Sequence, residues 1–169
     1  MLDRPSSATG YTVADLLAMD DIEGVRFELH EGMLLVVPPP LSEHQEAESD
    51  LQFYLRSQRR RVYANVGVMV DDVNYRIPDL VVLKKGEVLV PKVYQQPPSI
   101  IDIAIEIVSP TSRTQDRMIK PLVYARVGIP QYWLVEELSG ERIVIMHELQ
   151  GGKYVRTGET SVKEMVGED

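Results

Sequence analysis

An acidic residue inside an apolar run is the feature that most constrains how this chain can fold. Residues 101–108, Ile-Asp-Ile-Ala-Ile-Glu-Ile-Val, have the length and β-branched composition of a buried strand, yet they contain Glu106. An ionised carboxylate in that setting needs a cationic partner, a metal ion or a shifted pKa. A second apolar run, residues 80–83, directly follows Pro78 and Asp79. We infer that Asp79 and Glu106 meet over a divalent metal ion, and that the rest of the chain holds them there.

Size and composition predict one soluble globular domain over residues 1–169, with residues 1–10 forming a loose polar leader. The chain contains no cysteine, which excludes disulfide scaffolds and thiolate zinc sites and fits a cytoplasmic location. It has no apolar run of membrane-spanning length, and its first residues lack the basic and apolar regions of a signal peptide. We therefore expect no membrane partner.

The formal net charge of −8 argues, taken globally, against a protein that binds nucleic acid, because phosphate attracts positive surface. Local clusters count more than the total. A site built from carboxylates also contributes its own negative charge until a metal ion binds. The charge therefore does not decide the matter.

The order of elements predicts a mixed sheet flanked by helices, in the α/β or α+β class. A capping-box-like segment at Thr12 starts a helix over 13–19, and a hairpin joins strands 26–30 and 33–37. Ser42 caps a long helix that ends in arginines 56, 59, 60 and 61, which either complement the helix terminus or contact phosphate. Further strands are expected over 62–70, 73–77, 131–136, 142–149 and 153–156, with a loop over 84–99. A strand, helix and strand crossover over 101–135 suits a mixed sheet.

The helix expected over residues 116–127 contains a candidate catalytic lysine, Lys120. Asp116, Lys120 and Tyr124 are spaced by four and share one face, although Pro121 removes a backbone donor beside Lys120. Magnesium prefers oxygen ligands, so Asp79, Glu106 and the backbone carbonyl of Ile107 could hold one Mg²⁺ or Mn²⁺ ion. Lys120 is the candidate that orients the attacking water or stabilises the charged transition state.

Several short motifs resemble, in order and spacing, those of the Uma-type "putative restriction endonuclease" family. The resemblance extends from about Tyr11 to Tyr154. The motifs are Phe27-Glu28-Leu29-His30-Glu31-Gly32, Pro38-Pro39-Pro40, His44-Gln45, Ile77-Pro78-Asp79-Leu80-Val81-Val82, Glu106-Ile107-Val108-Ser109-Pro110, Asp116 with Lys120, Tyr124, and Gly128-Ile129-Pro130-Gln131-Tyr132-Trp133.

That family belongs to the PD-(D/E)XK nuclease superfamily. The resemblance implies a restriction-endonuclease-like core, with a mixed central sheet flanked by helices, that acts on nucleic acid with magnesium. Asp79 takes the place of the first acid and Glu106 that of the second. The superfamily lysine normally stands two residues after the second acid, where this chain has Val108. The resemblance suggests that Lys120, presented from the following helix, replaces it.

Other residues are candidates for supporting roles. His44 could orient substrate or support the metal site, Glu28 and Glu31 could add an acid, and Tyr124 could donate a hydrogen bond. Asp116 belongs to the same group because it shares the helix face of Lys120. Lys84, Lys85, Arg113 and Arg117 could contact the nucleic-acid backbone.

Two alternatives to a magnesium-dependent endodeoxyribonuclease stay open. A nuclease-like fold could act as a nucleic-acid or protein binding module with little catalysis, which Val108 and the acidic total charge favour. A homodimer formed through the apolar C-terminal strands is also expected, and it is compatible with catalysis.

Overall fold

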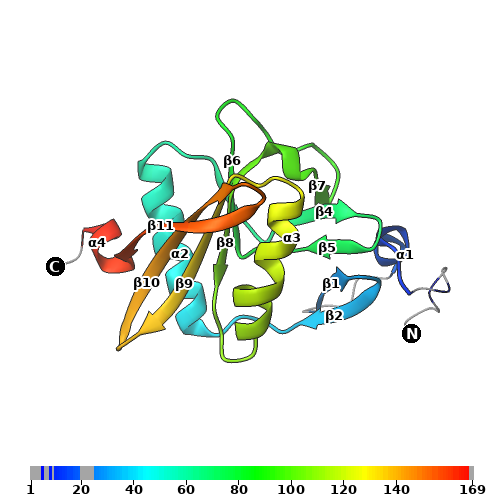
Figure 1. Ribbon diagram of the computed structural model, residues 1–169, viewed down its shortest axis with the longest axis horizontal. Helices are drawn as coiled ribbons and strands as arrows, with labels where there is room; N and C mark the ends of the chain where they lie inside the picture. The colour runs from blue at the N-terminus through cyan, green and yellow to red at the C-terminus, as the bar shows by residue number, and fades with distance from the viewer. Residues whose placement is uncertain (1–4, 6–7, 9, 20–24, 168–169) are drawn as a thin grey trace.

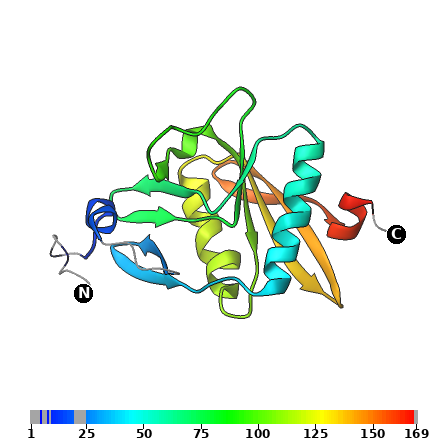
Figure 2. The ribbon, with the colours of Figure 1, turned by 180° about the vertical axis from the view of Figure 1, so that it is seen from behind.

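The chain forms two β-sheets, and helices cover opposite faces of the larger one (Figures 1 and 2). The computed structural model describes residues 5, 8, 10–19 and 25–167. Most of the predicted leader over residues 1–10 therefore lies outside the described residues. Helix α1 (Val13–Ala18) starts at Thr12, which makes the predicted capping box with Asp15.

The larger sheet is mixed, as the sequence predicted. Its strand order is β11-β10-β9-β8-β6-β3, and only the pair β8 and β9 is parallel among its described strands. The crossover between β8 and β9 runs through a π-helix and helix α3 (Lys120–Arg126). The bounds are β3 (Val62–Ala64), β6 (Leu80–Leu83), β8 (Ile101–Ile107), β9 (Gln131–Leu138), β10 (Glu141–Gln150) and β11 (Lys153–Ser161).

The smaller sheet has the order β2-β1-β5-β4-β7. Its strands are β1 (Arg26–His30), β2 (Met33–Val37), β4 (Gly67–Asp71), β5 (Asn74–Arg76) and β7 (Gln95–Gln96). The prediction of one strand over 62–70 was wrong, because the chain leaves one sheet and enters the other there. Asn65 has a left-handed φ of 55°, and a Cβ at Gly67 would lie 1.8 Å from the Tyr75 hydroxyl oxygen.

Helix α2 (Ser42–Ser57) covers one face of the larger sheet. Its buried side chains Ala47, Leu51 and Leu55 pack on the same cluster as Ile103 and Ile105 of β8. These side chains are spaced by four along the helix and form its apolar face. The predicted cap was wrong: Leu41 is the N-cap residue, and it makes no side-chain capping hydrogen bond.

The opposite face is covered by a helix that differs from the prediction. Residues 116–127 were expected to form one helix, but the chain forms the π-helix η2 (Gln115–Ile119) followed by α3 (Lys120–Arg126). Gly128, with φ of 74°, directly follows Val127, the C-cap residue of α3. The C-terminal strands are longer than expected. A final helix, α4 (Val162–Val166), was not predicted, although Ser161 and Glu164 form its capping box.

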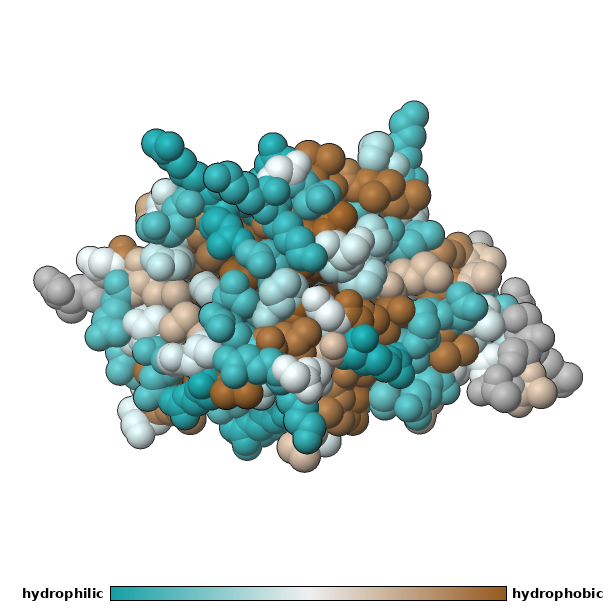
Figure 3. Space-filling model, turned by 45° about the horizontal axis from the view of Figure 1, so that its top comes forward, coloured by the Kyte–Doolittle hydropathy of each residue, from teal (hydrophilic) through white to brown (hydrophobic). Residues whose placement is uncertain are grey.

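The segment between β6 and β8, predicted as a loop, contains β7 and the short 3₁₀ helix η1 (Pro98–Ile100). Gln96 fixes its course, because the side-chain amide bonds both backbone groups of Val90 and the carbonyl of Val93. Tyr94 is 79% exposed here, and apolar side chains lie among polar ones on the surface that Figure 3 turns forward. None of the helices in the described ranges combines the length and apolar character needed to cross a membrane.

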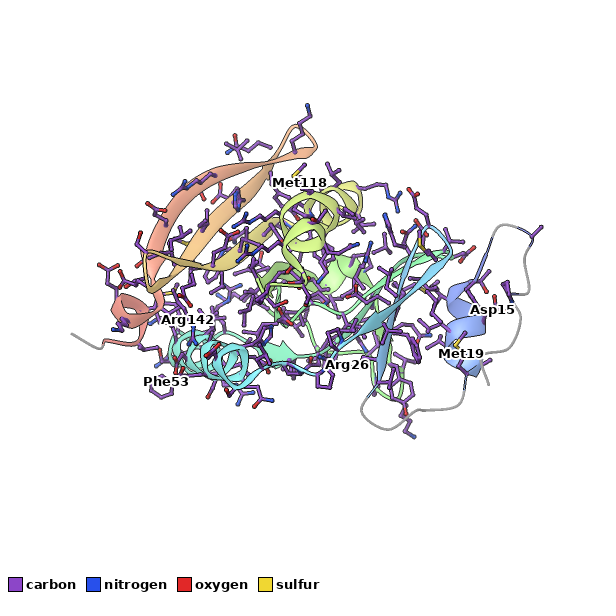
Figure 4. All side chains as sticks on the ribbon, turned by 90° about the horizontal axis from the view of Figure 1, so that it is seen from below. Asp15, Met19, Arg26, Phe53, Met118 and Arg142 are labelled. Carbon is purple, nitrogen blue, oxygen red and sulfur yellow. The ribbon has the colours of Figure 1, made fainter. Side chains whose placement is uncertain are left out.

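The packing of α2 predicts that two of its large apolar residues differ sharply in their contribution to stability. Leu51 is fully buried, so Leu51→Ala should lower the free energy of unfolding by about 2–5 kcal/mol. Phe53 is 67% exposed and points away from the sheet (Figure 4), so Phe53→Ala should change it by no more than about 0.5 kcal/mol. Urea unfolding measures both. Equal losses would contradict the packing.

Candidate active site

Asp79 and the backbone of Ile107 meet at one end of the larger sheet. Strands β6 and β8 are antiparallel neighbours with Leu80 opposite Ile105, so the residue before β6 lies beside the end of β8. Asp79 Oδ2 accepts a hydrogen bond of 2.7 Å from the Ile107 N–H. The structure thus places side by side the two strands that the sequence analysis paired. Figure 4 looks onto this end of the molecule.

Glu106 points toward α3 because side chains alternate along a strand. Its neighbours Ile105 and Ile107 pack on the α2 side, which leaves Glu106 on the other face with Ala104. There Glu106 Oε2 lies 2.7 Å from Lys120 Nζ, and Oε1 accepts a hydrogen bond of 2.7 Å from the Tyr124 hydroxyl. The side chain is 1% exposed. Burial raises the pKa of Glu106 well above its usual range, and the Lys120 ammonium offsets part of that rise.

Lys120 lies among several carboxylates. Besides Glu106, its Nζ lies 3.0 Å from Asp116 Oδ1 and 4.0 Å from Glu28 Oε1. Burial by itself lowers the pKa of Lys120, but the carboxylates of Glu106, Glu28 and Asp116 outweigh it and raise the pKa. Lys120 is therefore an ammonium cation throughout the physiological pH range.

The π-helix explains how Asp116 and Lys120 are held. The Lys120 N–H donates to the carbonyl of Gln115, five residues back, which leaves the Asp116 carbonyl without that donor. Pro121 has no N–H to offer it. The Tyr132 hydroxyl from β9 donates instead, at 2.5 Å. The helix irregularity beside Lys120 is thus stabilised by a side chain from the sheet.

Glu28 and Arg76 connect the smaller sheet to this cluster. Glu28 Oε1 accepts 2.8 Å from the Ile77 N–H, and Oε2 accepts 3.1 Å from Arg76 Nη1. Arg76 is 0% exposed. Its role was not predicted from the sequence, although a cation between the apolar Tyr75 and Ile77, just before Asp79, is a local signal for it.

His44, at the start of α2, borders Asp79. Its Nε2 lies 3.1 Å from Asp79 Oδ2, and its Nδ1 has no hydrogen-bond partner in the described part of the chain. Burial alone lowers the pKa of His44, but the hydrogen bond and charge of Asp79, with Glu48, outweigh it and raise the pKa. Two further charged residues, Glu48 and Arg26, lie near this pair and were not predicted from the sequence. Burial and the charge of Asp79 raise the pKa of Glu48, and His44 and Arg26 offset part of that rise.

Other predicted residues lie outside this cluster. Glu31 is exposed in the β1–β2 turn, where its N–H bonds Asn74. Arg113 is exposed in the connection after β8, and Arg117 makes two hydrogen bonds to Glu136, of 2.6 and 2.8 Å.

The two lysines proposed to contact nucleic acid, Lys84 and Lys85, follow the far end of β6. At about 3.3 Å per residue, Lys84 is roughly 16 Å along the chain from Asp79. Lys84 Nζ donates there to the Ser99 carbonyl. The arginines at the end of α2 lie at this same far end, where Arg60 pairs with Asp102 and Arg61 bonds the Glu87 carbonyl.

The donor set of the cluster fits a magnesium ion. Within the described residues, no three His, Cys, Asp or Glu side chains form a ready metal-binding group. Magnesium needs fewer protein ligands, because it keeps waters and takes one or two carboxylates together with substrate oxygens. Among the described residues, the carboxyl groups of Asp79, Glu106, Asp116 and Glu28 lie near two permanent cations, Lys120 and Arg76. Burial raises the pKa of both Glu106 and Asp116, and a divalent cation bound beside them would favour their ionised forms.

A family model and a solved structure both match this chain. The family model described as "Uma2: Putative restriction endonuclease" matches residues 13–166. A solved structure titled as a putative nuclease belonging to DUF820, from Anabaena variabilis ATCC 29413, superposes with a TM-score of 0.67. The two are 18% identical, and the match covers 92% of this chain and 97% of that one. This likeness confirms the predicted mixed α/β fold. No curated protein matches the chain.

The contact of Tyr132 with Asp116 predicts a measurable cost for one hydroxyl group. Tyr132→Phe leaves the buried Asp116 carbonyl without a donor, which should lower the free energy of unfolding by about 1–3 kcal/mol. Tyr94→Phe, on an exposed ring, is the control and should change it by no more than about 0.5 kcal/mol. Thermal or urea unfolding that shows no difference between the two would refute the assigned contact.

The raised pKa of His44 predicts a pH-dependent contribution to stability in the metal-free protein. Protonation is favoured in the folded state, so this contribution is fully present below the unfolded pKa of about 6.5. It is lost as pH rises through the higher folded pKa. The stability difference between the wild type and His44→Gln should therefore shrink with rising pH. Urea unfolding in a chelator at several pH values measures it, and a difference that does not vary with pH would count against the contact.

Proposed function

Because this chain belongs to the Uma2 family, described as putative restriction endonucleases, we propose that it is a magnesium-dependent endonuclease that hydrolyses DNA phosphodiester bonds. One observation carries the proposal. A buried glutamate from β8, a lysine from α3 and the aspartate just before β6 lie together at one end of the sheet. Such clusters of buried ionisable groups with strongly perturbed pKa values are typical of catalytic sites.

The ion would be held by Asp79, Glu106 and the carbonyl of Ile107, with Mn²⁺ able to replace Mg²⁺. When bound, it lowers the pKa of a coordinated water and neutralises charge on the phosphodiester. His44 orients Asp79 through their 3.1 Å contact, and the Tyr124 hydroxyl orients Glu106. Both carboxylates are thereby held in fixed positions before substrate arrives.

Lys120 supplies positive charge to the reaction. Its raised pKa keeps it protonated, so it does not act as a general base at neutral pH. An ammonium held by Glu106 and Asp116 can orient the attacking water and stabilise negative charge that develops on the phosphate. In the PD-(D/E)XK superfamily this role belongs to a lysine two residues after the second acid. This chain has Val108 at that position, two residues after Glu106.

Substrate contact and assembly complete the proposal. Arg113 is exposed in the connection that follows β8, at the site end of the strand, and is the better placed of the predicted backbone contacts. Lys84 and Lys85, at the far end of β6, could contact only a distant part of a long duplex. The predicted homodimer would use the edge strand β11, where Val155 is 45% exposed. Sedimentation tests that state, and the cytoplasmic location stays a prediction.

The alternative is a nuclease-like binding module with little catalysis, favoured by Val108 in the place of the usual lysine. Titration calorimetry with Mg²⁺ or Mn²⁺ separates the two functions. An endonuclease of this kind must bind the ion, and the binding should weaken when Asp79 is replaced by alanine. DNA binding without any bound divalent ion would favour the module.

Cleavage assays with plasmid and linear DNA test the proposed roles. Asp79→Ala and Glu106→Ala should abolish magnesium-dependent cleavage, and Lys120→Met should lower kcat by about 10²–10³-fold through loss of electrostatic stabilisation. Asp102→Asn is the matched control, because Asp102 is an acid on the same strand as Glu106 but pairs with Arg60 at the other end. The control should cleave like the wild type. If Asp79→Ala and Glu106→Ala cleave DNA as well as the wild type does, the assignment of these two acids as metal ligands is wrong.

A further inference from the structure

Arg76 is a buried cation that the proposed mechanism does not use. It is 0% exposed, so it cannot touch DNA or a metal-bound water. Its Nη1 donates to Glu28, but Nε and Nη2 have no hydrogen-bond partner among the described residues. A buried ion pair that leaves donors unsatisfied is weak as a source of stability. Its place beside the site points to another role.

Glu28 is the link between Arg76 and the site. One of its oxygens accepts from Arg76, and the other accepts from the Ile77 N–H at 2.8 Å. Lys120 Nζ lies 4.0 Å from Glu28 but only 2.7 Å from Glu106. Lys120 is thus close enough to be attracted by Glu28, yet it makes its hydrogen bond with Glu106.

We propose that Arg76 is a positioning residue for Lys120, acting through Glu28. By binding Glu28 it balances the charge of that carboxylate and holds it back, so that the ammonium of Lys120 stays on Glu106. Without Arg76, Lys120 is the described cation that remains within 4.0 Å of Glu28, and it would be drawn toward it. The consequence for catalysis rests on the proposed function, whereas the effect on the position of Lys120 does not.

The same pair also fixes the approach to Asp79. Glu28 bonds both Arg76 and the N–H of Ile77, and the chain runs from there through Pro78 into Asp79. Proline restricts this connection further. Arg76 and Glu28 therefore act on Lys120 through space and on Asp79 through the backbone.

Kinetics should separate positioning from a purely structural role. Arg76→Gln should lower kcat per folded molecule by about 10–100-fold, as for other residues that orient catalytic groups, and leave the KM for DNA within about 3-fold. Arg76→Lys restores the charge and should recover part of the loss. Leu55→Ala, a core variant at the far end of α2, controls for lost stability and should leave kcat per folded molecule unchanged.

The Glu28→Gln background gives a second variant in case Arg76→Gln fails to fold. Glutamine removes the carboxylate charge that would draw Lys120 away from Glu106 once Arg76 is lost. Adding Arg76→Gln to it should cost no further activity. If Arg76→Gln lowers kcat in the Glu28→Gln background as much as it does in the wild type, the proposal is overturned.

A readout independent of activity is the energetic coupling between Arg76 and Lys120. Unfolding free energies of Arg76→Gln, Lys120→Gln and the double variant should be non-additive, because both cations act on Glu28. The coupling should vanish in the Glu28→Gln background. If the wild type cleaves no DNA, the proposed function fails, and this cycle still decides the inference: coupling through Glu28 supports it, and additivity overturns it.

Discussion

The structure depends on the burial of Glu106 against Lys120. A carboxylate and an ammonium lose most of their hydration in such a place, and the pair is tolerated only because other groups satisfy both partners. Tyr124 bonds the free oxygen of Glu106, and Asp116 adds a second carboxylate to Lys120. These contacts come from β8 and from the helix that crosses over it, so forming the site and docking the crossover are one event. The polar cluster is therefore part of the packing between sheet and helix.

The two sheets meet at this cluster. Strand β5 belongs to the smaller sheet and β6 to the larger one, and the short connection between them carries Asp79 to the end of β8. Glu28 of β1 bonds that connection and lies beside Lys120. A displacement of one sheet against the other would thus separate Glu28, on the smaller sheet, from Lys120, on the helix that covers the larger sheet. The smaller sheet holds the site together, which is a reason for it to be present beside a sheet that already has its own core.

Much of the site could be predicted from local pattern, because its acids interrupt apolar strands. Glu106 in the isoleucine run and Asp79 before a strand stand out in the sequence, and a spacing of four placed Lys120 with Asp116. What could not be predicted depends on contacts between distant segments. The bond of Tyr132 to the Asp116 carbonyl, the pairing of Arg76 with Glu28, and the transfer of the chain between sheets at Asn65 and Gly67 leave only weak local signals.

The π-helix has a consequence for how this segment tolerates changes in length. A π-turn is geometrically an α-helix with one extra residue, and each residue of an α-helix turns the chain by about 100°. Deleting Gln115, the residue between Thr114 and Asp116, would let the backbone hydrogen bonds of this segment form as in a regular α-helix. Residues before the deletion would then rotate by about 100° relative to α3. Lys120 and the acids of the preceding strand would lose their alignment although every one of them remained. In this segment the number of residues is itself a part of the site.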